Sequence, residues 1–343
     1  MKKILVTGGC GYIGSHTIID LIDHGYDIVS IDDLSNAHAS SIDHIKAITG
    51  RSVPNYTVDL KDLEATRDVF RQEGPFAGII HFAAYKLVGE SVEKPLAYFR
   101  NNLCSLLNIL ECMREFETDN LIFSSSCSVY GNSRELPVTE HTPRQEAESP
   151  YGRTKQMGED ILRDVSRLLG HPKTVLLRYF NPAGAHESGL HGEDPANKAS
   201  NLVPVITETA IGKREKMTVF GTDYDTRDGS CVRDYIHVMD LAAAHTLALQ
   251  YLLDKRNQDT CEIFNLGIGE GVTVLEAIEA FEKVTGQQLS YELGPRRAGD
   301  VEAIYANYDQ AAKRLHWQPR RNIEDIMATA WKWEQKRSAP APS

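Results

Sequence analysis

The sequence predicts an α/β protein whose main unit is a doubly wound parallel sheet, with helices on both faces. Short apolar runs recur along the first half of the chain, helical patterns separate most of them, and the first run leads into a glycine-rich turn. Continuous rather than alternating apolar strands are typical of parallel sheets covered on both faces. The predicted strands are 2–7, 27–32, 55–60, 77–83, 120–126 and 174–180, and the clearest predicted helices are 15–24, 103–116 and 152–169.

The strand–helix alternation stops after Phe180, and the later part of the chain mixes short helices with short strands. We therefore expect a first domain over 1–180, with a returning segment near 230–270 that rejoins its sheet. A smaller α/β domain over 181–337 would bind the substrate, and the Ala/Pro-rich end, 338–343, is expected to be disordered.

Composition excludes several kinds of partner. The chain has 343 residues and a net charge of −11, which argues against binding to nucleic acid or to an anionic membrane. The six cysteines form no CxxC pair and no zinc-spaced cluster with histidine, so we expect free thiols, no metal site and a cytoplasmic location. The sequence has neither a signal-peptide pattern nor an apolar run of membrane-spanning length.

A dinucleotide site is predicted at the first turn. Gly8, Gly11 and Gly14 lie between a strand and a helix, where glycine permits a tight turn and a pyrophosphate can approach the helix N-terminus. Asp32 ends the next strand, where a carboxylate can bind the adenosine ribose. A structural tight turn is the alternative, but the strand–turn–helix–strand–acid order favours a Rossmann-type site. Asp32 and Asp33 would repel a 2′-phosphate, which favours NAD over NADP.

Three residues form a candidate catalytic group. Tyr151 and Lys155 are four residues apart near the start of a helix, so they share a face. Free tyrosine has a pKa of about 10, but a nearby ammonium group and an oxidised nicotinamide ring would lower it. Ser126 ends the fifth predicted strand, where its hydroxyl could reach a substrate oxygen. A Tyr-x-x-x-Lys pair alone occurs by chance in many helices. The pattern becomes selective because Ser126 also stands at the expected place, the end of the fifth predicted strand.

These features together resemble the extended short-chain dehydrogenase/reductases, and further segments resemble the UDP-hexose 4-epimerases within that family. The resemblance covers about residues 3–335. The segments that carry it are 11–17 (GYIGSHT), 81–84 (HFAA), 88–91 (VGES), 123–126 (FSSS), 129–131 (VYG), 149–152 (SPYG), 177–182 (LRYFNP), 192–194 (GED) and 232–241 (VRDYIHVMDL). The segment 232–241 is the most selective of them.

The resemblance implies a C4 epimerase that interconverts UDP-glucose and UDP-galactose through a transient 4-keto sugar, with tightly bound NAD, as a step of galactose metabolism. Further implied cofactor contacts are Tyr12, Ile13, Asn36, Asp59, Leu60, Phe82, Ala83, Lys86, Asn101 and Tyr179. Implied contacts to the UDP-hexose, beyond Lys86, Ser126 and Tyr151, are Asn181, Asn201, Leu202, Phe220, Arg233, Arg297, Asp300 and Ile304. It also implies a homodimer formed through the helices around 95–116 and 152–169.

Physical reasoning supports some of these roles and leaves alternatives open. Arg233 and Arg297 could neutralise a pyrophosphate, or could be surface ion pairs. Lys86 could reach a cofactor phosphate or be a solvated loop lysine, and Phe220 could flank a uracil or belong to the core. Ile304 could limit the size of the sugar or be a core residue of a short strand.

The sequence departs from the epimerase pattern in places, which leaves those contacts open. Asp33 stands where asparagine is common, and Ala84-Tyr85 replaces a usual Gly-Leu pair beside the nicotinamide position. Cys127-Ser128 follows Ser126 where Ala-Thr is common.

Three rival functions remain for comparison. A 4,6-dehydratase needs an acid/base pair after the strand-five hydroxyl residue, and Ser126 is followed by Cys127 and Ser128 instead. A non-catalytic NAD-binding regulator would not need Tyr151 and Lys155. A dehydrogenase that exchanges free NAD(H) would not retain the cofactor through purification.

Overall fold

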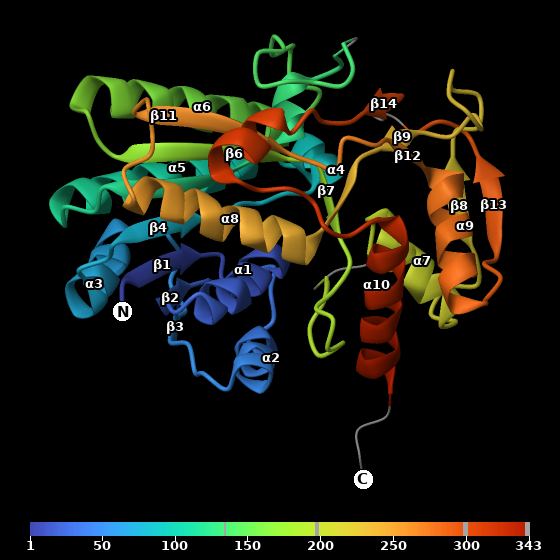
Figure 1. Cartoon of the computed structure of the whole chain (residues 1–343), viewed down its shortest axis with the longest axis horizontal. Helices are drawn as coiled ribbons and strands as arrows, with labels where there is room; N and C mark the ends of the chain where they lie inside the picture. The colour runs from blue at the N-terminus through green and yellow to red at the C-terminus, as the bar shows by residue number, and fades with distance from the viewer. Residues whose placement is uncertain (134, 196–198, 298–300, 340–343) are drawn as a thin grey trace.

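A seven-stranded, all-parallel sheet forms the centre of the computed structural model (Figure 1), which describes residues 1–133, 135–195, 199–297 and 301–339. In spatial order its strands are β11 (Cys261–Leu266), β6 (Lys173–Tyr179), β5 (Asn120–Ser126), β4 (Gly78–His81), β1 (Lys3–Thr7), β2 (Asp27–Ile31) and β3 (Asn55–Tyr56). The predicted doubly wound parallel sheet is confirmed.

Helices cover both faces of this sheet, as Figure 1 shows. One face packs against α1 (Tyr12–Asp23), α2 (Ser40–Thr49) and α8 (Val238–Leu253); the other packs against α3 (Leu63–Glu73), α5 (Pro95–Glu115) and α6 (Pro150–Leu169). Side chains of one strand alternate between these two cores. In β1, Ile4 and Val6 belong to the first core and Leu5 to the second. Burial on both faces explains why the strands are continuously apolar.

Segments remote in sequence complete this layer. The strand β11 pairs with β6 in parallel along its whole length, and α8 packs against α1. Both come from the part of the chain after Phe180. The central sheet is therefore built from the first 180 residues together with a later strand and its preceding helix.

The rest of the chain forms a smaller α/β part, at the right of Figure 1. Its core lies between helices and a two-stranded parallel pair, β8 (Met217–Phe220) with β13 (Tyr291–Gly294). The helices are α7 (Leu202–Ala210), α9 (Val274–Thr285) and α10 (Ile323–Ser338). The remaining elements are α4 (Val88–Glu93), β7 (Asn181–Ala183), β9 (Val232–Arg233), β10 (Tyr235–His237), β12 (Val272–Thr273), β14 (Ala303–Ile304) and the short helices η1 (Cys127–Tyr130) and η2 (Ala311–Leu315).

Element boundaries differ from the sequence prediction where local capping decides them. The third predicted strand, 55–60, is only two residues long, because the Asp59 carboxylate accepts a hydrogen bond from the Lys61 N–H and Asp62 caps α3. The helix α5 starts at Pro95, eight residues before the predicted start, since proline fits the first turn of a helix. The C-terminal helix α10 continues through Ser338, the first residue of the predicted disordered tail, and 340–343 lie outside the described residues.

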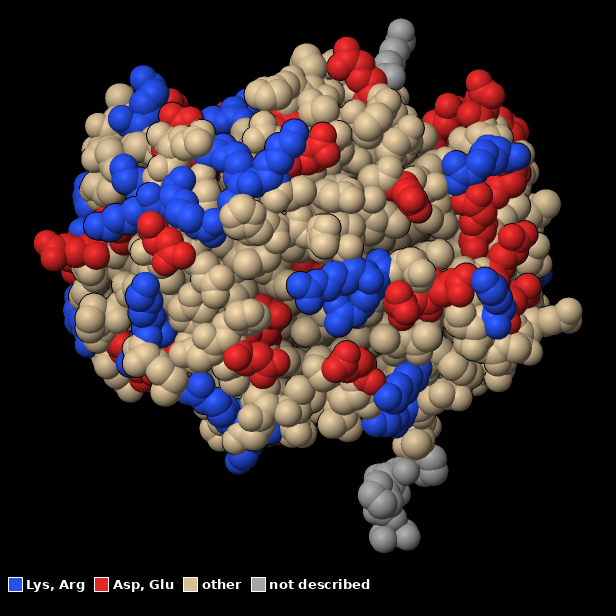
Figure 2. All heavy atoms as spheres, in the orientation of Figure 1, with Lys and Arg blue, Asp and Glu red and all other residues tan. Residues whose placement is uncertain are grey.

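Charged side chains of both signs are interspersed on the face drawn in Figure 2, and acidic ones predominate over β8, α9 and β13. Among the described residues, no helix is both long enough and apolar enough to cross a membrane. The six cysteines are free thiols.

Candidate active site

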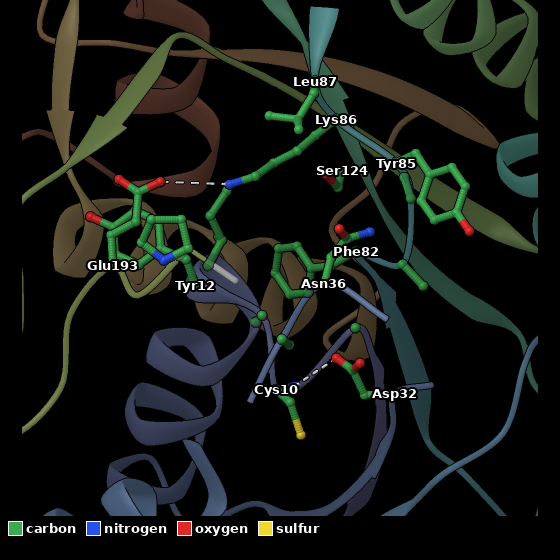
Figure 3. A pocket seen from close by; sticks show the side chains of 18 of the residues that line it. Cys10, Tyr12, Asp32, Asn36, Phe82, Tyr85, Lys86, Leu87, Ser124 and Glu193 are labelled. Atoms are coloured by element: carbon green, nitrogen blue, oxygen red, sulfur yellow. Dashed lines mark hydrogen bonds and ion pairs between the residues drawn. The ribbon is translucent and has the colours of Figure 1, made fainter. Parts of the chain in front are cut away.

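The carboxyl ends of the central strands open into a cavity of about 460 Å³. Strand β1 lies between β2 and β4. Successive strands β2 and β3 are added on one side of β1, and β4, β5 and β6 on the other, so the order of the strands reverses at β1. Doubly wound sheets bind ligands at such a switch point. Figure 3 shows a pocket whose walls come from segments far apart in sequence, with Tyr12, Asp32, Lys86, Ser124 and Glu193 among them.

The glycine turn between β1 and α1 has no room for side chains. Gly8 has a φ of +70°, and a Cβ there would lie 2.8 Å from the Ala83 nitrogen. A Cβ on Gly14 would lie 2.2 Å from the Gly8 oxygen. Gly11 precedes α1 in an extended conformation, and no side chain caps the N–H groups of the first turn. These donors and the positive end of the helix dipole suit a pyrophosphate, so the turn fits a dinucleotide.

Tyr151 and Lys155 of α6 face the end of β5. The Lys155 Nζ donates a 2.6 Å hydrogen bond to the Ser124 carbonyl oxygen and lies 5.8 Å from the centre of the Tyr151 ring. Burial lowers the pKa of Lys155 to about 8, an effect that the nearby Glu159 carboxylate opposes. The site therefore holds an ammonium group at the point where the sequence predicted one.

Burial acts on the tyrosine in the opposite sense. It raises the pKa of Tyr151 to about 12, while a hydrogen bond with the Ser126 hydroxyl works to lower it. A phenol with so high a pKa stays protonated near neutral pH. Acting as a base therefore needs further positive charge beside the ring, and the oxidised nicotinamide of NAD carries such a charge.

A later segment of the chain closes the far side of the cavity. Lys86, which follows β4, lies with its Nζ 3.7 Å from the Glu193 carboxylate, the contact drawn across the pocket in Figure 3. Glu193 also accepts a 2.7 Å hydrogen bond from the Asn201 amide. The Tyr12 hydroxyl donates to the Gly184 carbonyl oxygen at 2.6 Å. The cavity is therefore shared between the sheet part and the smaller part.

Comparisons with known proteins agree on one family. The family model described as GDP-mannose 4,6 dehydratase matches residues 5–330. The chain is 47% identical to UDP-glucose 4-epimerase 2 of Arabidopsis thaliana, covering 97% of this chain and 95% of that protein, and 46% identical to the UDP-glucose 4-epimerase of Bacillus subtilis, covering 96% of each. A crystal structure of the Bifidobacterium longum UDP-glucose 4-epimerase in complex with NAD+ and UDP aligns with a TM-score of 0.93 at 43% identity, over 98% of both chains. This chain belongs to the UDP-glucose 4-epimerase family.

All the residues that the family resemblance assigned to the cofactor line the cavity. Asp32 is buried, and its carboxylate accepts hydrogen bonds from the backbone N–H groups of Cys10 at 3.0 Å and Leu34 at 2.9 Å. The carboxylate of Asp33, the departure from the family pattern, binds the backbone and hydroxyl of Ser35. Asp32 thus shapes the glycine turn as well as facing the cavity.

The predicted substrate residues divide into two groups. Asn181 and Asn201 line the cavity with Lys86, Ser126 and Tyr151, whereas five others do not: Leu202, Phe220, Arg233, Arg297 and Ile304. Asp300 lies outside the described residues. Phe220 is 43% exposed at the end of β8, Arg297 is exposed, and Leu202 packs against the core of the smaller part.

Arg233 and Ile304 are neighbours on the paired strands β9 and β14. The positive charge of Arg233 acts on Cys127, whose pKa burial raises to about 12. Ile304 is buried in an apolar cluster that includes Phe180 and Cys127, and those two residues line the cavity. Both residues therefore lie close behind its wall.

Sequence reasoning missed the cavity residue Ser124, and it missed Lys61, which contacts two residues of the cavity wall. Ser124 accepts the Lys155 hydrogen bond and its hydroxyl bonds to Tyr179, and only the run of three serines could have pointed to it. Lys61 bridges two predicted cofactor residues, with its Nζ 2.9 Å from the Asp59 carboxylate and 3.0 Å from the Asn101 oxygen. At the Ala84-Tyr85 departure, the backbone of Tyr85 is held by two hydrogen bonds with the Asn102 side chain. No group of three metal-ligating side chains occurs within the described residues.

The position of Asp32 leads to a prediction about cofactor choice. Asp32→Gly should retain NAD at least about tenfold less well and admit NADP, because the variant loses both the ribose acceptor and the like charge that opposes a 2′-phosphate. The measurement is the NAD and NADP released by acid from protein loaded with an equal mixture. Asp33→Asn is the control and should change the ratio less, since Asp33 faces Ser35. Equal occupancy of the unmodified protein by both cofactors would contradict this.

Proposed function

We propose that this chain interconverts UDP-glucose and UDP-galactose by epimerisation at C4, with NAD held in the cavity. The observation that carries the proposal is that Ser126, Tyr151 and Lys155 line the same cavity as the glycine turn. Full-length relatives with 44–47% identity are UDP-glucose 4-epimerases, which supports the same reaction.

NAD supplies the chemistry of accepting a hydride from the sugar C4 and returning it. Gly11 and the first turn of α1 would bind its pyrophosphate, Asp32 its adenosine ribose, and Lys155 its nicotinamide ribose. We assign the adenine end to the loops after β2 and β3, where Asn36, Asp59 and Leu60 line the cavity.

The chain's own residues would move one proton. The Tyr151 oxygen takes the proton from the sugar 4-hydroxyl, and the Ser126 hydroxyl hydrogen-bonds that same oxygen. Lys155 holds positive charge beside the phenol and so favours the phenolate. Because hydride must return to the opposite face of the sugar, the sugar has to turn over within the cavity.

The nucleotide would anchor the substrate while the sugar turns. Asn181 and Asn201 line the cavity and would contact the nucleotide, and Arg233, whose charge acts on the cavity residue Cys127, would attract its pyrophosphate. We further propose that four residues contact the nucleotide: Leu202, Phe220, Arg297 and Asp300. Binding the distant nucleotide tightly and the sugar loosely uses remote binding energy to permit the motion.

The rival functions fit less well. The family model is described as a dehydratase, but Ser126 is followed by Cys127 in the short helix η1 and not by an acid/base pair. A regulator that only binds NAD would have no need for a buried lysine and a half-buried tyrosine beside a serine.

We also propose a homodimer, a cytoplasmic location and a two-domain organisation. Large apolar side chains are exposed on α4 to α6, including Val92 at 62%, Leu96 at 81% and Leu107 at 45%, and a second copy of the chain could cover them. Six free thiols suit a reducing compartment. The NAD-binding domain would comprise 1–180 with α8 and β11, and the nucleotide-sugar domain the rest of 181–337.

The experiment that tests the proposed function is an assay without added cofactor. Purified protein fed with UDP-galactose should form UDP-glucose, and acid denaturation should release NAD(H). Activity that appears only when free NAD is supplied in excess would favour a dehydrogenase that exchanges its cofactor.

The proton-transfer role predicts the effect of Tyr151→Phe. Loss of the base should lower kcat by roughly a thousandfold or more while the content of bound NAD stays unchanged. Combining it with Ser126→Ala should cost much less than the product of the two single losses, because both hydroxyls act on one proton. Steady-state kinetics of the four proteins decide this, and near-normal turnover by Tyr151→Phe would rule out the mechanism.

The location of Ile304 predicts substrate selectivity. Unmodified protein should discriminate against the N-acetylated UDP-hexoses, since Ile304 is a rigid β-branched side chain that fills the space behind Phe180 and Cys127. Ile304→Ser should raise the ratio of kcat/KM for UDP-N-acetylgalactosamine to that for UDP-galactose by about tenfold or more.

Ile304→Val retains the branched shape and is the matched control, with a ratio near that of the unmodified protein. The role would be wrong if the unmodified protein used both substrates equally well, or if Ile304→Ser left the ratio where it was.

A further inference from the structure

A buried ion pair lies directly beneath the catalytic residues. Glu159 of α6 and Arg178 of β6 have side chains that are 0% and 1% exposed, and two hydrogen bonds join them, at 2.8 Å and 2.6 Å. Neither residue lines the cavity. The proton transfer proposed above does not use them, although each is close in sequence to residues that line the cavity.

Glu159 ties the catalytic helix to the catalytic strand. It follows Lys155 by one helical turn, and its carboxylate accepts a 2.7 Å hydrogen bond from the Ser125 hydroxyl. Ser125 lies in β5 between Ser124, whose carbonyl oxygen holds the Lys155 ammonium group, and Ser126. One carboxylate therefore fixes the register between the two elements that carry Ser126, Tyr151 and Lys155.

Arg178 extends this connection across the sheet. Its third hydrogen bond, at 3.0 Å, goes to the Tyr130 hydroxyl, which donates to the Asn265 side chain at 2.6 Å. Tyr130 belongs to η1, directly after the serine run, and Asn265 belongs to β11. Thus α6, β5, β6, η1 and β11 share one buried polar network.

The charges around Glu159 are mostly positive. Besides Arg178, the guanidinium groups of Arg163 and Arg144 lie 3.4 Å and 3.7 Å from its carboxylate. Arg144 has a second carboxylate partner in Asp160. Arg178 otherwise donates to the neutral Tyr130 hydroxyl, and its charge also acts on the Glu140 carboxylate, which accepts a hydrogen bond from the Asn265 N–H. Cys261 of β11 also faces this group, and burial keeps its thiol neutral by raising its pKa to about 12.

Besides Glu159, the groups that the structure describes around the Lys155 ammonium carry no negative charge. They are His81 of β4, whose pKa burial and Lys155 lower to about 3, the Ser124 carbonyl oxygen and Phe123 ring of β5, and Tyr151 on its own helix. Tyr179 of β6 bonds to the Ser124 hydroxyl and is a neutral phenol. Within the described part of the chain, Glu159 is the anion that favours the charged form of Lys155.

We propose that Glu159 is a positioning residue for the reaction: its carboxylate holds Ser126 in register with Tyr151 and Lys155, and balances Arg178 so that Lys155 stays an ammonium group. This rests on the proposed function, because it assigns to Glu159 the support of the proton transfer. Glu159 touches neither sugar nor cofactor. Its removal therefore affects kcat and the pH dependence of kcat rather than substrate affinity.

The test is the pH profile of kcat for the NAD-loaded Glu159→Gln protein. Glutamine keeps the shape of the side chain but leaves Arg178 without its counter-charge, which disfavours the ammonium form of Lys155. The fall of kcat at alkaline pH should move to lower pH by about one unit or more, so that the variant loses more activity at high pH than at low pH. KM for UDP-galactose and bound NAD should stay within about twofold of the unmodified protein.

Three further variants separate positioning from folding. Glu159→Asp keeps the negative charge, so the fall of kcat at alkaline pH (the alkaline limb of the profile) should return in large part to the pH at which it occurs in the unmodified protein. Ser125→Ala removes only the hydrogen bond, so it should lower kcat by about three- to tenfold without moving that limb. Glu262→Gln is the matched control, because Glu262 is a 3% exposed carboxylate of β11 paired with Arg314 at 2.5 Å, remote from the lysine. It should lower Tm and leave the pH profile unchanged.

The outcomes distinguish this inference from the function on which it rests. Unmodified protein that does not epimerise UDP-galactose would overturn the proposed function. Active unmodified protein together with a Glu159→Gln profile of the same shape, lower in activity at every pH, would overturn the positioning role. If Glu159→Gln does not fold, normal kinetics in both Glu159→Asp and Ser125→Ala would overturn it equally.

Discussion

The Lys155 ammonium group is buried at the carboxyl end of the sheet, and much of the site is arranged around it. Removing such a charge from water costs several kcal/mol unless nearby groups compensate. Here the Ser124 carbonyl oxygen accepts a 2.6 Å hydrogen bond from the ammonium group, the Phe123 ring lies 5.1 Å away, and Glu159 provides the opposite charge one turn along α6. The same loss of hydration on burial raises the pKa of Tyr151, so the phenol and the ammonium group must be considered together.

This arrangement requires a fold that brings distant segments to one edge. The parallel sheet places the ends of β1, β2, β4, β5 and β6 side by side, and the smaller part covers them from the other side. Contacts that join the parts across the cavity include the hydrogen bond from the Tyr12 hydroxyl to Gly184, the bond between His191 and Ser15, and the approach of Lys86 to Glu193. A cavity closed by both parts can hold a nucleotide at one end and leave a sugar room to move at the other.

Much of the sheet and the cofactor side of the cavity could be predicted from sequence, because they depend on local patterns. Apolar runs indicate strands, and the glycines between β1 and α1 follow from a backbone approach that no Cβ would permit. The nucleotide side was harder to predict. Asn181 and Asn201 line the cavity, but Arg233 and Ile304 lie behind its wall, since β9 and β14 are paired by contacts between segments some 70 residues apart in the chain.

Residues that act through others gave no sequence signal. Glu159 looks like an ordinary helical glutamate until Arg178 and Ser125 are placed around it, and Lys61 is unremarkable until Asp59 and Asn101 approach. Helix and strand boundaries moved for a similar reason, because capping side chains such as Asp62 and Ser149 compete with hydrophobic periodicity.

The central claim is that Tyr151 becomes the base because positive charge on both sides of its ring overcomes the effect of burial. It can be measured by the ultraviolet absorbance of the phenolate as a function of pH, as the difference between the unmodified protein and Tyr151→Phe. In protein without bound NAD, Tyr151 should titrate at a pKa of about 12. In the NAD-loaded protein, its pKa should be lower by about three units or more. A Tyr151 phenolate that forms at the same high pH with and without NAD would contradict the account.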